Sequence, residues 1–253
     1  MPRYKLVIEY DGTPYNGFQR QENLPSVQQA IEDAFAVFTQ EKTDIFAAGR
    51  TDTGVHALGQ VIHVDLSKHW SQQKVQEALN GILKYEGHPI CALDVFEVED
   101  DFDARFSAIK RKYKYRIINR MGPLTVDVDR AWWIRFPLDV DKMDEAAKVL
   151  LGHHDFSTFR STDCQAKTPM RTLDVLDVKR AGNEEIHVIA ESRSFLHNQV
   201  RSIVGSLKLI GDGKWTKEDL LAAKDSLDRK RCGPVAPACG LYLNEVEYLD
   251  PLP

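Results

Sequence analysis

The sequence predicts an α+β protein with a largely antiparallel sheet. Segments rich in β-branched and aromatic residues, typical of strands, alternate along the chain with segments whose apolar residues recur at helical spacing. The first hundred residues follow the order strand, helix, strand, loop, strand, helix, strand, which favours helices packed on a sheet. With 253 residues, 43% hydrophobic and 28% charged, the chain has the size and composition of a soluble globular protein.

Each element of the first half has a local signal. Residues 4–10 are strand-like, and residues 11–14 indicate the turn that ends this strand. Ser26 with Gln29 gives a capping-box pattern at the start of a helix over 27–38. The other predicted elements are an apolar run at 45–48, a half-buried strand at 62–66, a helix at 75–82 and a strand at 90–98.

The second half alternates in the same way. Residues 110–118 have the pattern of a strand, and Gly152 is placed to end a helix over 143–150 at its C′ position. Residues 153–171 are largely polar and predict a long loop, which in proteins is usually functional or mobile. The remaining predicted elements are strands at 131–136, 173–178, 186–190 and 240–248, and helices at 201–210 and 220–227.

The bulk composition argues against several classes of protein. No apolar run approaches the roughly 18 residues needed to span a bilayer, and the N-terminus shows no signal peptide. The four cysteines, Cys91, Cys164, Cys232 and Cys239, form no CxxC pair, which indicates free thiols in a reducing cytosol and no zinc site. We therefore expect a cytoplasmic protein that does not contact membranes. A net charge of −5 argues against a surface coated in basic residues but allows a local basic cluster.

The segment Gly49–Ala57, GRTDTGVHA, places an acid, a cation and a titratable ring in one short loop. Arg50 precedes Asp52 by two residues, and His56 follows it by four. The glycines on either side of Asp52 let the backbone adopt positive φ and let a ligand approach closely. The plain alternative is a polar turn between two strands, because Asp is a common turn residue.

A basic cluster lies between residues 105 and 120, within a stretch from 104 to 125 that contains no acidic residue. On a strand its side chains divide into a basic face and a mixed face: Lys112, Lys114 and Arg116 against Arg111, Tyr113, Tyr115 and Ile117. Such a strand is either an edge strand protected by charge or a track for an RNA backbone, with aromatic rings directed into a cleft. In an otherwise acidic chain we favour the RNA track.

Two histidine segments invite a metal hypothesis that their patterns do not support. His63 and Asp65 alternate on a strand, which more often gives a solvated face. The neighbours His153, His154 and Asp155 point apart, and no partner with ligand spacing follows.

Arg201 lies among apolar residues near the start of a predicted helix. A buried arginine needs a carboxylate partner. The plain alternative is a local surface pair.

Five segments resemble the motifs of one enzyme family. They are YDGTPYNGFQRQ at 10–21, GRTDTGVHA at 49–57, ARFSAIKRKYKY at 104–115, FLHNQVRSIVG at 195–205 and APACGLYLNEVEY at 236–248. This wording is similar to that of the pseudouridine synthases, specifically the bacterial tRNA pseudouridine synthase A family, over nearly the whole chain. The resemblance implies the pseudouridine synthase fold: two α+β halves, 1–105 and 106–253, with a mostly antiparallel mixed sheet around a central basic cleft.

The resemblance also places a tRNA-contacting insertion at 153–171. Two departures from the family pattern are the segment Leu83–Ile90 and Asp103, which stands where a histidine is common. Both concern local RNA contacts rather than the chemistry.

The reaction implied by the resemblance is the isomerisation of uridine to pseudouridine at positions 38, 39 and 40 in the anticodon stem-loop of tRNA. The family works as a homodimer and needs no cofactor or metal. Asp52 would be the catalytic carboxylate, either attacking as a nucleophile or abstracting a ribose proton. A stacked uridine must first be flipped out of its helix. The implied substrate-binding residues are Tyr113, which stacks on the base, Arg105, which fills the space the base leaves, Arg50, which contacts RNA or positions the loop, and Arg201, which pairs with Asp52.

Two other classes of function are open at this point. A non-catalytic RNA-binding or RNA-chaperone protein would keep the basic strand and lose nothing measurable on Asp52→Ala. An aspartate-based hydrolase using Asp52 and His56 would act on a small substrate without RNA, and would give the basic cluster no role.

Overall fold

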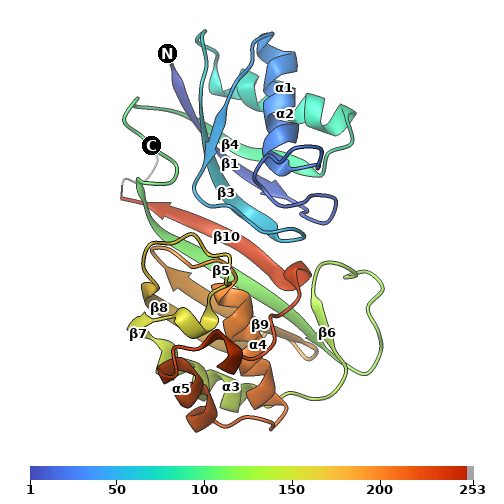
Figure 1. Ribbon diagram of the computed structural model, residues 1–253. Helices are drawn as coiled ribbons and strands as arrows, with labels where there is room; N and C mark the ends of the chain where they lie inside the picture. Colours follow the sequence, from blue (N-terminus) through green and yellow to red (C-terminus); the bar gives the residue numbers. More distant parts are fainter. Residues whose placement is uncertain (250–253) are drawn as a thin grey trace. The chain divides into compact units, whose positions relative to one another are not determined.

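The computed structural model describes residues 1–249, which fold into two compact units (Figure 1). The first unit comprises Met1–Ile109 together with the chain from Tyr242 onward, and the second comprises Lys110–Leu241. The final strand thus belongs to the N-terminal unit, whereas the sequence analysis places it in the C-terminal half. Pairing rather than chain position decides where a strand belongs.

The first unit is a sheet in the order β4 (Ile90–Val98), β1 (Arg3–Tyr10), β3 (His56–Asp65) and β10 (Leu241–Tyr248). β1 is antiparallel to both its neighbours, and β10 runs parallel to the start of β3. The short β2 (Ile45–Ala47) pairs with the far end of β3. Two helices, α1 (Val27–Thr39) and α2 (Gln72–Tyr85), cover one face of this sheet (Figure 1).

The predicted periodicities mark the core of this unit. Alternate residues of β1, Tyr4, Leu6 and Ile8, are fully buried, as are Phe35 of α1 and Leu79 of α2. The Ser26 N-cap is confirmed, because its hydroxyl accepts a hydrogen bond from the Gln29 N–H at 3.2 Å at the start of α1. The second bond of a capping box, from the Gln29 side chain to the Ser26 N–H, is not among the hydrogen bonds of the described residues.

The second unit is a mostly antiparallel sheet in the order β5 (Ala108–Asn119), β9 (Glu185–Ser192), β8 (Met170–Arg180) and β7 (Gly152–Asp155). The short β6 (Trp132–Ile134) pairs in parallel with β5. Its helices are α3 (Val140–Ala147), α4 (Gln199–Gly211) and α5 (Lys217–Asp225). The described chain therefore confirms an α+β fold with a mostly antiparallel, mixed set of strands.

Residues 153–171 are not one long loop, as their polarity predicts. His153–Asp155 lie in β7, which pairs with β8 from Met170 to Leu173, and residues 157–159 form a 3-10 turn. A polar edge strand and a polar loop have the same composition, because an edge strand can turn most of its side chains to solvent. The distinction depends on the pairing partner.

Candidate active site

Asp52 lies in the loop that joins β2 to β3, so the predicted placement between two strands is confirmed. The Val55 N–H donates to the Asp52 carbonyl oxygen at 3.1 Å and closes a tight turn. Gly54 has the left-handed φ of 73° that this turn requires. Gly49 differs from the expectation: its φ is not positive, and a Cβ there meets nothing within 4 Å. Asp52 itself is half-buried.

A second segment, Tyr10–Phe18, holds the Asp52 loop from the N-terminal side. The Phe18 N–H donates to the Thr51 carbonyl oxygen at 3.0 Å, and the Tyr10 hydroxyl shares a 2.8 Å hydrogen bond with the Thr51 hydroxyl. Burial raises the pKa of Tyr10 to about 12, so its hydroxyl stays protonated at neutral pH. Two residues of this segment thus fix the residue immediately before Asp52.

Two glycines allow this close contact. A Cβ on Gly12 would lie 2.0 Å from the Val55 carbonyl oxygen, and one on Gly17 would lie 2.8 Å from the Thr51 carbonyl oxygen. No larger residue fits at either point without a shift of backbone. This role of the segment was not predicted from the sequence; the available signal was the pair of glycines five residues apart in DGTPYNG.

His56, the first residue of β3, joins the same two segments. Its Nδ1 accepts the Gly12 N–H at 3.0 Å, and Asp11 Oδ1 lies 3.2 Å from the same nitrogen. The ring stacks on Tyr242 of β10 with centroids 4.7 Å apart, and the residue is only 2% exposed. The hydrogen bond from Gly12 uses Nδ1 as an acceptor, a role that a histidine nitrogen can take only while it carries no proton.

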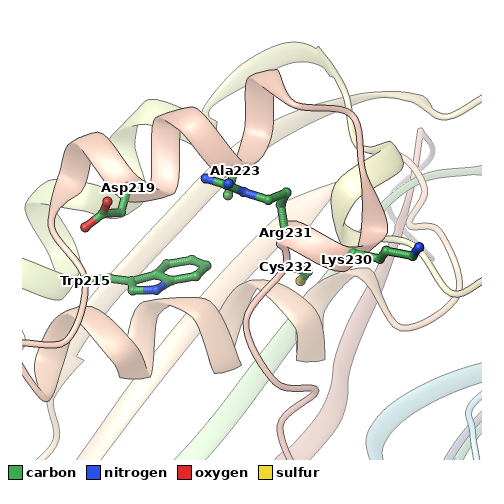
Figure 2. Close-up of a pocket in the computed structure, with 6 residues that line it drawn as sticks. All are labelled: Trp215, Asp219, Ala223, Lys230, Arg231 and Cys232. Atoms are coloured by element: carbon green, nitrogen blue, oxygen red, sulfur yellow. The ribbon is translucent and has the colours of Figure 1, made fainter.

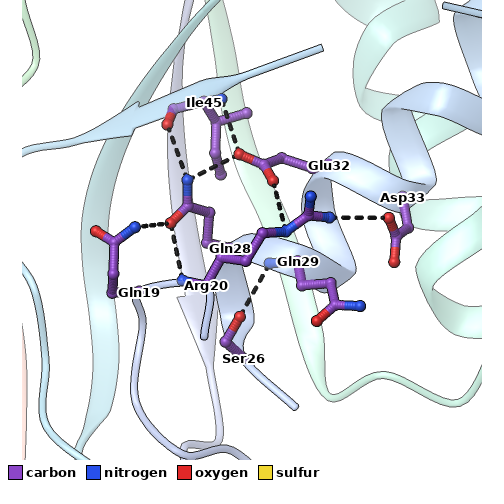
Figure 3. Close-up of polar contacts among 8 residues, drawn as sticks. All are labelled: Gln19, Arg20, Ser26, Gln28, Gln29, Glu32, Asp33 and Ile45. Atoms are coloured by element: carbon purple, nitrogen blue, oxygen red, sulfur yellow. Dashed lines mark hydrogen bonds and ion pairs between the residues drawn. The ribbon is translucent and has the colours of Figure 1, made fainter. Parts of the chain in front are cut away.

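A polar network extends this support into α1 (Figure 3). Arg20, just beyond the Tyr10–Phe18 segment, forms 3.2 Å ion pairs with Glu32 and Asp33. Glu32 is 5% exposed and also accepts the Ile45 N–H at 3.3 Å, at the start of β2. One buried carboxylate therefore ties the strand that leads into the Asp52 loop to α1 and to Arg20.

Arg105 lies on an exposed turn whose shape is set by Asp103. The Asp103 carboxylate accepts the backbone N–H groups of Arg105 at 2.7 Å and Phe106 at 2.8 Å. The Arg105 guanidinium lies 5.5 Å from the centroid of the Phe106 ring, which belongs to a 76% exposed residue. Asp103, which stands where the family commonly has a histidine, therefore supplies the carboxylate that caps this turn.

The same turn is anchored to the sheet through Ala104. Its N–H donates to His63 Nδ1 at 3.0 Å, and its carbonyl oxygen accepts the Tyr248 hydroxyl at 2.7 Å. Burial, and then the charge of Arg3, lower the pKa of His63, which favours the neutral ring that this acceptor role needs. Asp65 forms a bidentate pair with Arg3, with both contacts at 2.7 Å. His63 and Asp65 thus each have a structural partner, Ala104 and Arg3 respectively.

The described residues 1–249 are also informative about metal ligands and membrane-spanning helices. No group of three or more His, Cys, Asp or Glu side chains is arranged there to hold a metal ion. None of the helices in this range has the length and apolar character that crossing a bilayer requires.

Tyr113 and Arg201 belong to the second unit. Tyr113 is half-buried on β5, and its ring meets Phe195 edge-on, with centroids 5.1 Å apart at 88°. Arg201, in the first turn of α4, donates from Nε to the Ala236 carbonyl oxygen at 2.8 Å and from Nη1 to the Asn198 side chain at 2.9 Å. Arg50, which is exposed, Asp52 and Arg105 belong to the first unit. The pairing of Arg201 with Asp52 stays a prediction.

The positive charge of the basic cluster is partly neutralised by acidic residues that lie outside the acid-free stretch 104–125. The ion pairs, all at 3.3 Å or less, are Lys110 with Glu191, Arg116 with Glu185 and Asp127, and Arg120 with Glu184. The glutamates come from β9 and the residue before it, because β9 is the antiparallel neighbour of β5. The number of cations in this stretch therefore overstates the positive charge that it offers to RNA.

Comparisons with known proteins agree with the motifs. A family model described as tRNA pseudouridine synthase matches residues 6–107 and 146–249. A tRNA pseudouridine synthase A of Rhizobium meliloti is 58% identical over 248 residues, covering 98% of this chain and 100% of the relative. The proteins of the same name from Xanthobacter autotrophicus and Brucella ovis are 58% and 57% identical, covering 98% and 99% of this chain and 100% of each relative. Among solved structures, a Cbf5–Nop10–Gar1 complex aligns with a TM-score of 0.37 at 9% identity, over 81% of this chain and 44% of that one.

The family model and the relatives define an RNA-modifying isomerase, since they cover most of both units. The chain belongs to the tRNA pseudouridine synthase family.

Proposed function

We propose that this protein converts uridine to pseudouridine at positions 38, 39 and 40 in the anticodon stem-loop of tRNA, with Asp52 as its catalytic residue. The observation that carries the proposal is the Asp52 loop, in which a half-buried carboxylate stands on a backbone fixed by Thr51 and Val55. A group that must meet one ribose atom benefits from such pre-organisation, because misplacement by about 1 Å can cost on the order of 100-fold in rate. The enzyme works in the cytoplasm as a homodimer.

The reaction exchanges one glycosidic bond for another. The N1–C1′ bond of the uridine breaks, the base turns, and C5 bonds to C1′. The proton on C5 is lost, and N1 takes up a proton from water, so that the product is an isomer of the substrate. Asp52 either attacks the nucleotide as a nucleophile or removes a ribose proton, and both roles use the ionised carboxylate. Arg201 pairs with this carboxylate and orients it. Its two described hydrogen bonds, to Ala236 and Asn198, hold the guanidinium in one position.

Three further residues handle the RNA. Tyr113 stacks on the flipped base, and its edge-on contact with Phe195 fixes the plane of the ring. Arg105 enters the space that the base leaves, from a turn made rigid by Asp103. Arg50 is exposed beside Asp52 and contacts the RNA backbone.

The proposal is tested with tRNA transcripts that carry tritium at C5 of uridine. Isomerisation at C5 releases this tritium to water, so release by the wild-type protein measures the reaction directly. We expect release from a transcript with uridine at positions 38–40 and none from a matched transcript with cytidine at all three. Undiminished release from the second transcript would show that the protein isomerises uridine, but at tRNA positions other than 38–40. No release from any tRNA would leave the RNA-binding alternative, and sedimentation of the same preparation tests the homodimer.

Substitutions of His56 test whether its acceptor nitrogen positions the catalytic loop. His56→Phe keeps a ring to stack on Tyr242 but cannot accept the Gly12 N–H, whereas His56→Asn keeps an acceptor near the Nδ1 position and loses the ring. We expect His56→Phe to lower kcat about 10-fold or more, with KM for tRNA nearly unchanged, because it shifts the loop and touches no substrate. His56→Asn should retain more activity than His56→Phe. The reverse order would show that the stacked ring, not the hydrogen bond, supports the loop.

A further inference from the structure

A pocket in the second unit is lined by none of the predicted site residues (Figure 2). It has a volume of about 230 Å³ and lies between α5 and the chain on either side of it. Its lining residues are Trp215, Asp219, Ala223, Lys230, Arg231 and Cys232.

The charges around this pocket differ from those elsewhere on the same helices. Lysines nearby are paired with acids: Lys208 with Asp212, Lys217 with Glu145 and Lys224 with Asp225. In the described part of the chain, the side chains of Lys230 and Arg231 have neither an acidic partner nor a hydrogen-bond acceptor. Two unpaired cations beside a hollow, in a chain with a net charge of −5, indicate an anionic ligand rather than general surface charge.

The other walls supply a flat ring and an acceptor. Trp215 is half-buried, and its indole N–H has no acceptor among residues 1–249. Asp219 Oδ2 is held by the N-cap of α5, where it accepts the Thr216 N–H at 2.8 Å, and this contact leaves Oδ1 available. Figure 2 shows the Arg231 side chain reaching toward Trp215 and Asp219, while Lys230 points outward.

These groups match the chemistry of a nucleotide. Proteins hold unstacked bases against aromatic rings and arginine guanidinium planes, and read their edges with side-chain acceptors. Ligand sites for drug-sized molecules are usually about 300–1,000 Å³, so this smaller pocket suits one base rather than an extended cofactor. The outward Lys230 is placed to meet a phosphate joined to such a base.

We propose that this pocket binds one nucleobase, stacked on Trp215 and Arg231, with Asp219 accepting hydrogen bonds from N–H groups of the base and Lys230 contacting its phosphate. Guanine fits best, because its N1–H and N2–H₂ donors are adjacent and both can donate to the available Oδ1 of Asp219. The base arrives either in an RNA chain or as a free mononucleotide; the recognition chemistry is the same. The site is independent of the reaction proposed for Asp52.

Tryptophan emission reports the site directly. Full-length protein is titrated with GMP, UMP, inorganic phosphate and a single-stranded guanine-containing oligoribonucleotide, and Trp215→Phe supplies the background from the other tryptophans. We expect quenching that is absent in Trp215→Phe, with tighter binding of GMP than of UMP. Arg231→Gln should weaken binding about tenfold, which is within the range for loss of one stacking partner. Asp219→Asn keeps an oxygen for the α5 cap and should remove the preference for GMP.

The matched control for Arg231→Gln is Lys217→Gln. It removes one positive charge from α5, the helix that carries Asp219, at a position outside the pocket. Binding of the oligoribonucleotide without binding of GMP identifies an RNA chain as the source, and binding of both allows the free nucleotide. No Trp215-dependent signal with any probe overturns the proposal, as does an equal loss in Lys217→Gln and Arg231→Gln. Tritium release by the wild type is measured separately, so failure of the isomerase proposal and failure of this one are distinguishable.

Discussion

Asp52→Asn is expected to release no measurable tritium from C5-labelled tRNA, a loss of about 10⁴-fold or more in kcat. Asparagine has the size of aspartate but neither attacks carbon as a carboxylate does nor accepts a proton at neutral pH. The fold of the loop should survive, because the turn is closed by the backbone carbonyl of residue 52 and not by its side chain. Binding of tRNA should change by no more than about threefold, since the lost interaction acts in the transition state.

Asp44→Asn is the matched control, because it makes the same chemical change at an exposed position just before β2. It should release tritium at the wild-type rate. Release by both variants would show that the protein is an isomerase whose catalytic group is a residue other than Asp52. Loss of tRNA binding together with activity in Asp52→Asn would assign the residue to RNA binding or folding.

Gly12→Ala is expected to lower kcat about 100-fold without touching the substrate. The new Cβ would lie 2.0 Å from the Val55 carbonyl oxygen and 2.6 Å from its carbon, and both are backbone atoms that cannot swing aside. Val55 closes the Asp52 turn and Gly12 donates to His56, so any relief of the clash moves the Asp52 loop or breaks that hydrogen bond. We expect a cost of about 1–3 kcal/mol in the free energy of unfolding as well.

Gly49→Ala separates this effect from a general sensitivity of the loop. It lies three residues from Asp52, its φ is not positive, and a Cβ there meets nothing within 4 Å. Activity and melting temperature should match those of the wild type or improve slightly, because alanine reduces the entropy of the unfolded chain. Full activity in Gly12→Ala would show that the Tyr10–Phe18 segment does not position the loop.

Local signals predicted those parts of the molecule that depend on residues close in sequence. The Ser26 cap, the helical spacing of α1 and the turn that carries Asp52 are each decided within a few residues, and the structure confirms them. The support of the Asp52 loop was not predictable in this way. Tyr10 meets Thr51 across 41 residues and Gly12 meets His56 across 44, and no local pattern sets these contacts.

Alternation along a strand predicts which side chains share a face of the sheet, but not how deeply each of them is buried. Tyr113 and Tyr115 fall on one face of β5, as predicted, yet Tyr115 is fully buried and donates its hydroxyl to the Pro237 carbonyl oxygen at 2.7 Å. Gly240 lies so close that a Cβ there would be 2.5 Å from the Tyr115 ring. The second tyrosine is thus a core residue, and only Tyr113 is a candidate to stack on a base. The ion pair between Glu185 and Arg116 was likewise not predictable from the sequence, because it depends on the pairing of β9 with β5.

The parallel pairing of β10 with β3 has a consequence for how the enzyme is made. Residue 56 supports the Asp52 loop, and the ring stacked on it is Tyr242, which is synthesised only after the whole of the second unit. Most of the N-terminal unit can form while the second unit is still being synthesised, but its sheet lacks its last strand until then. A nascent chain therefore acquires the full support of its Asp52 loop only when β10 has left the ribosome, after the second unit has been synthesised.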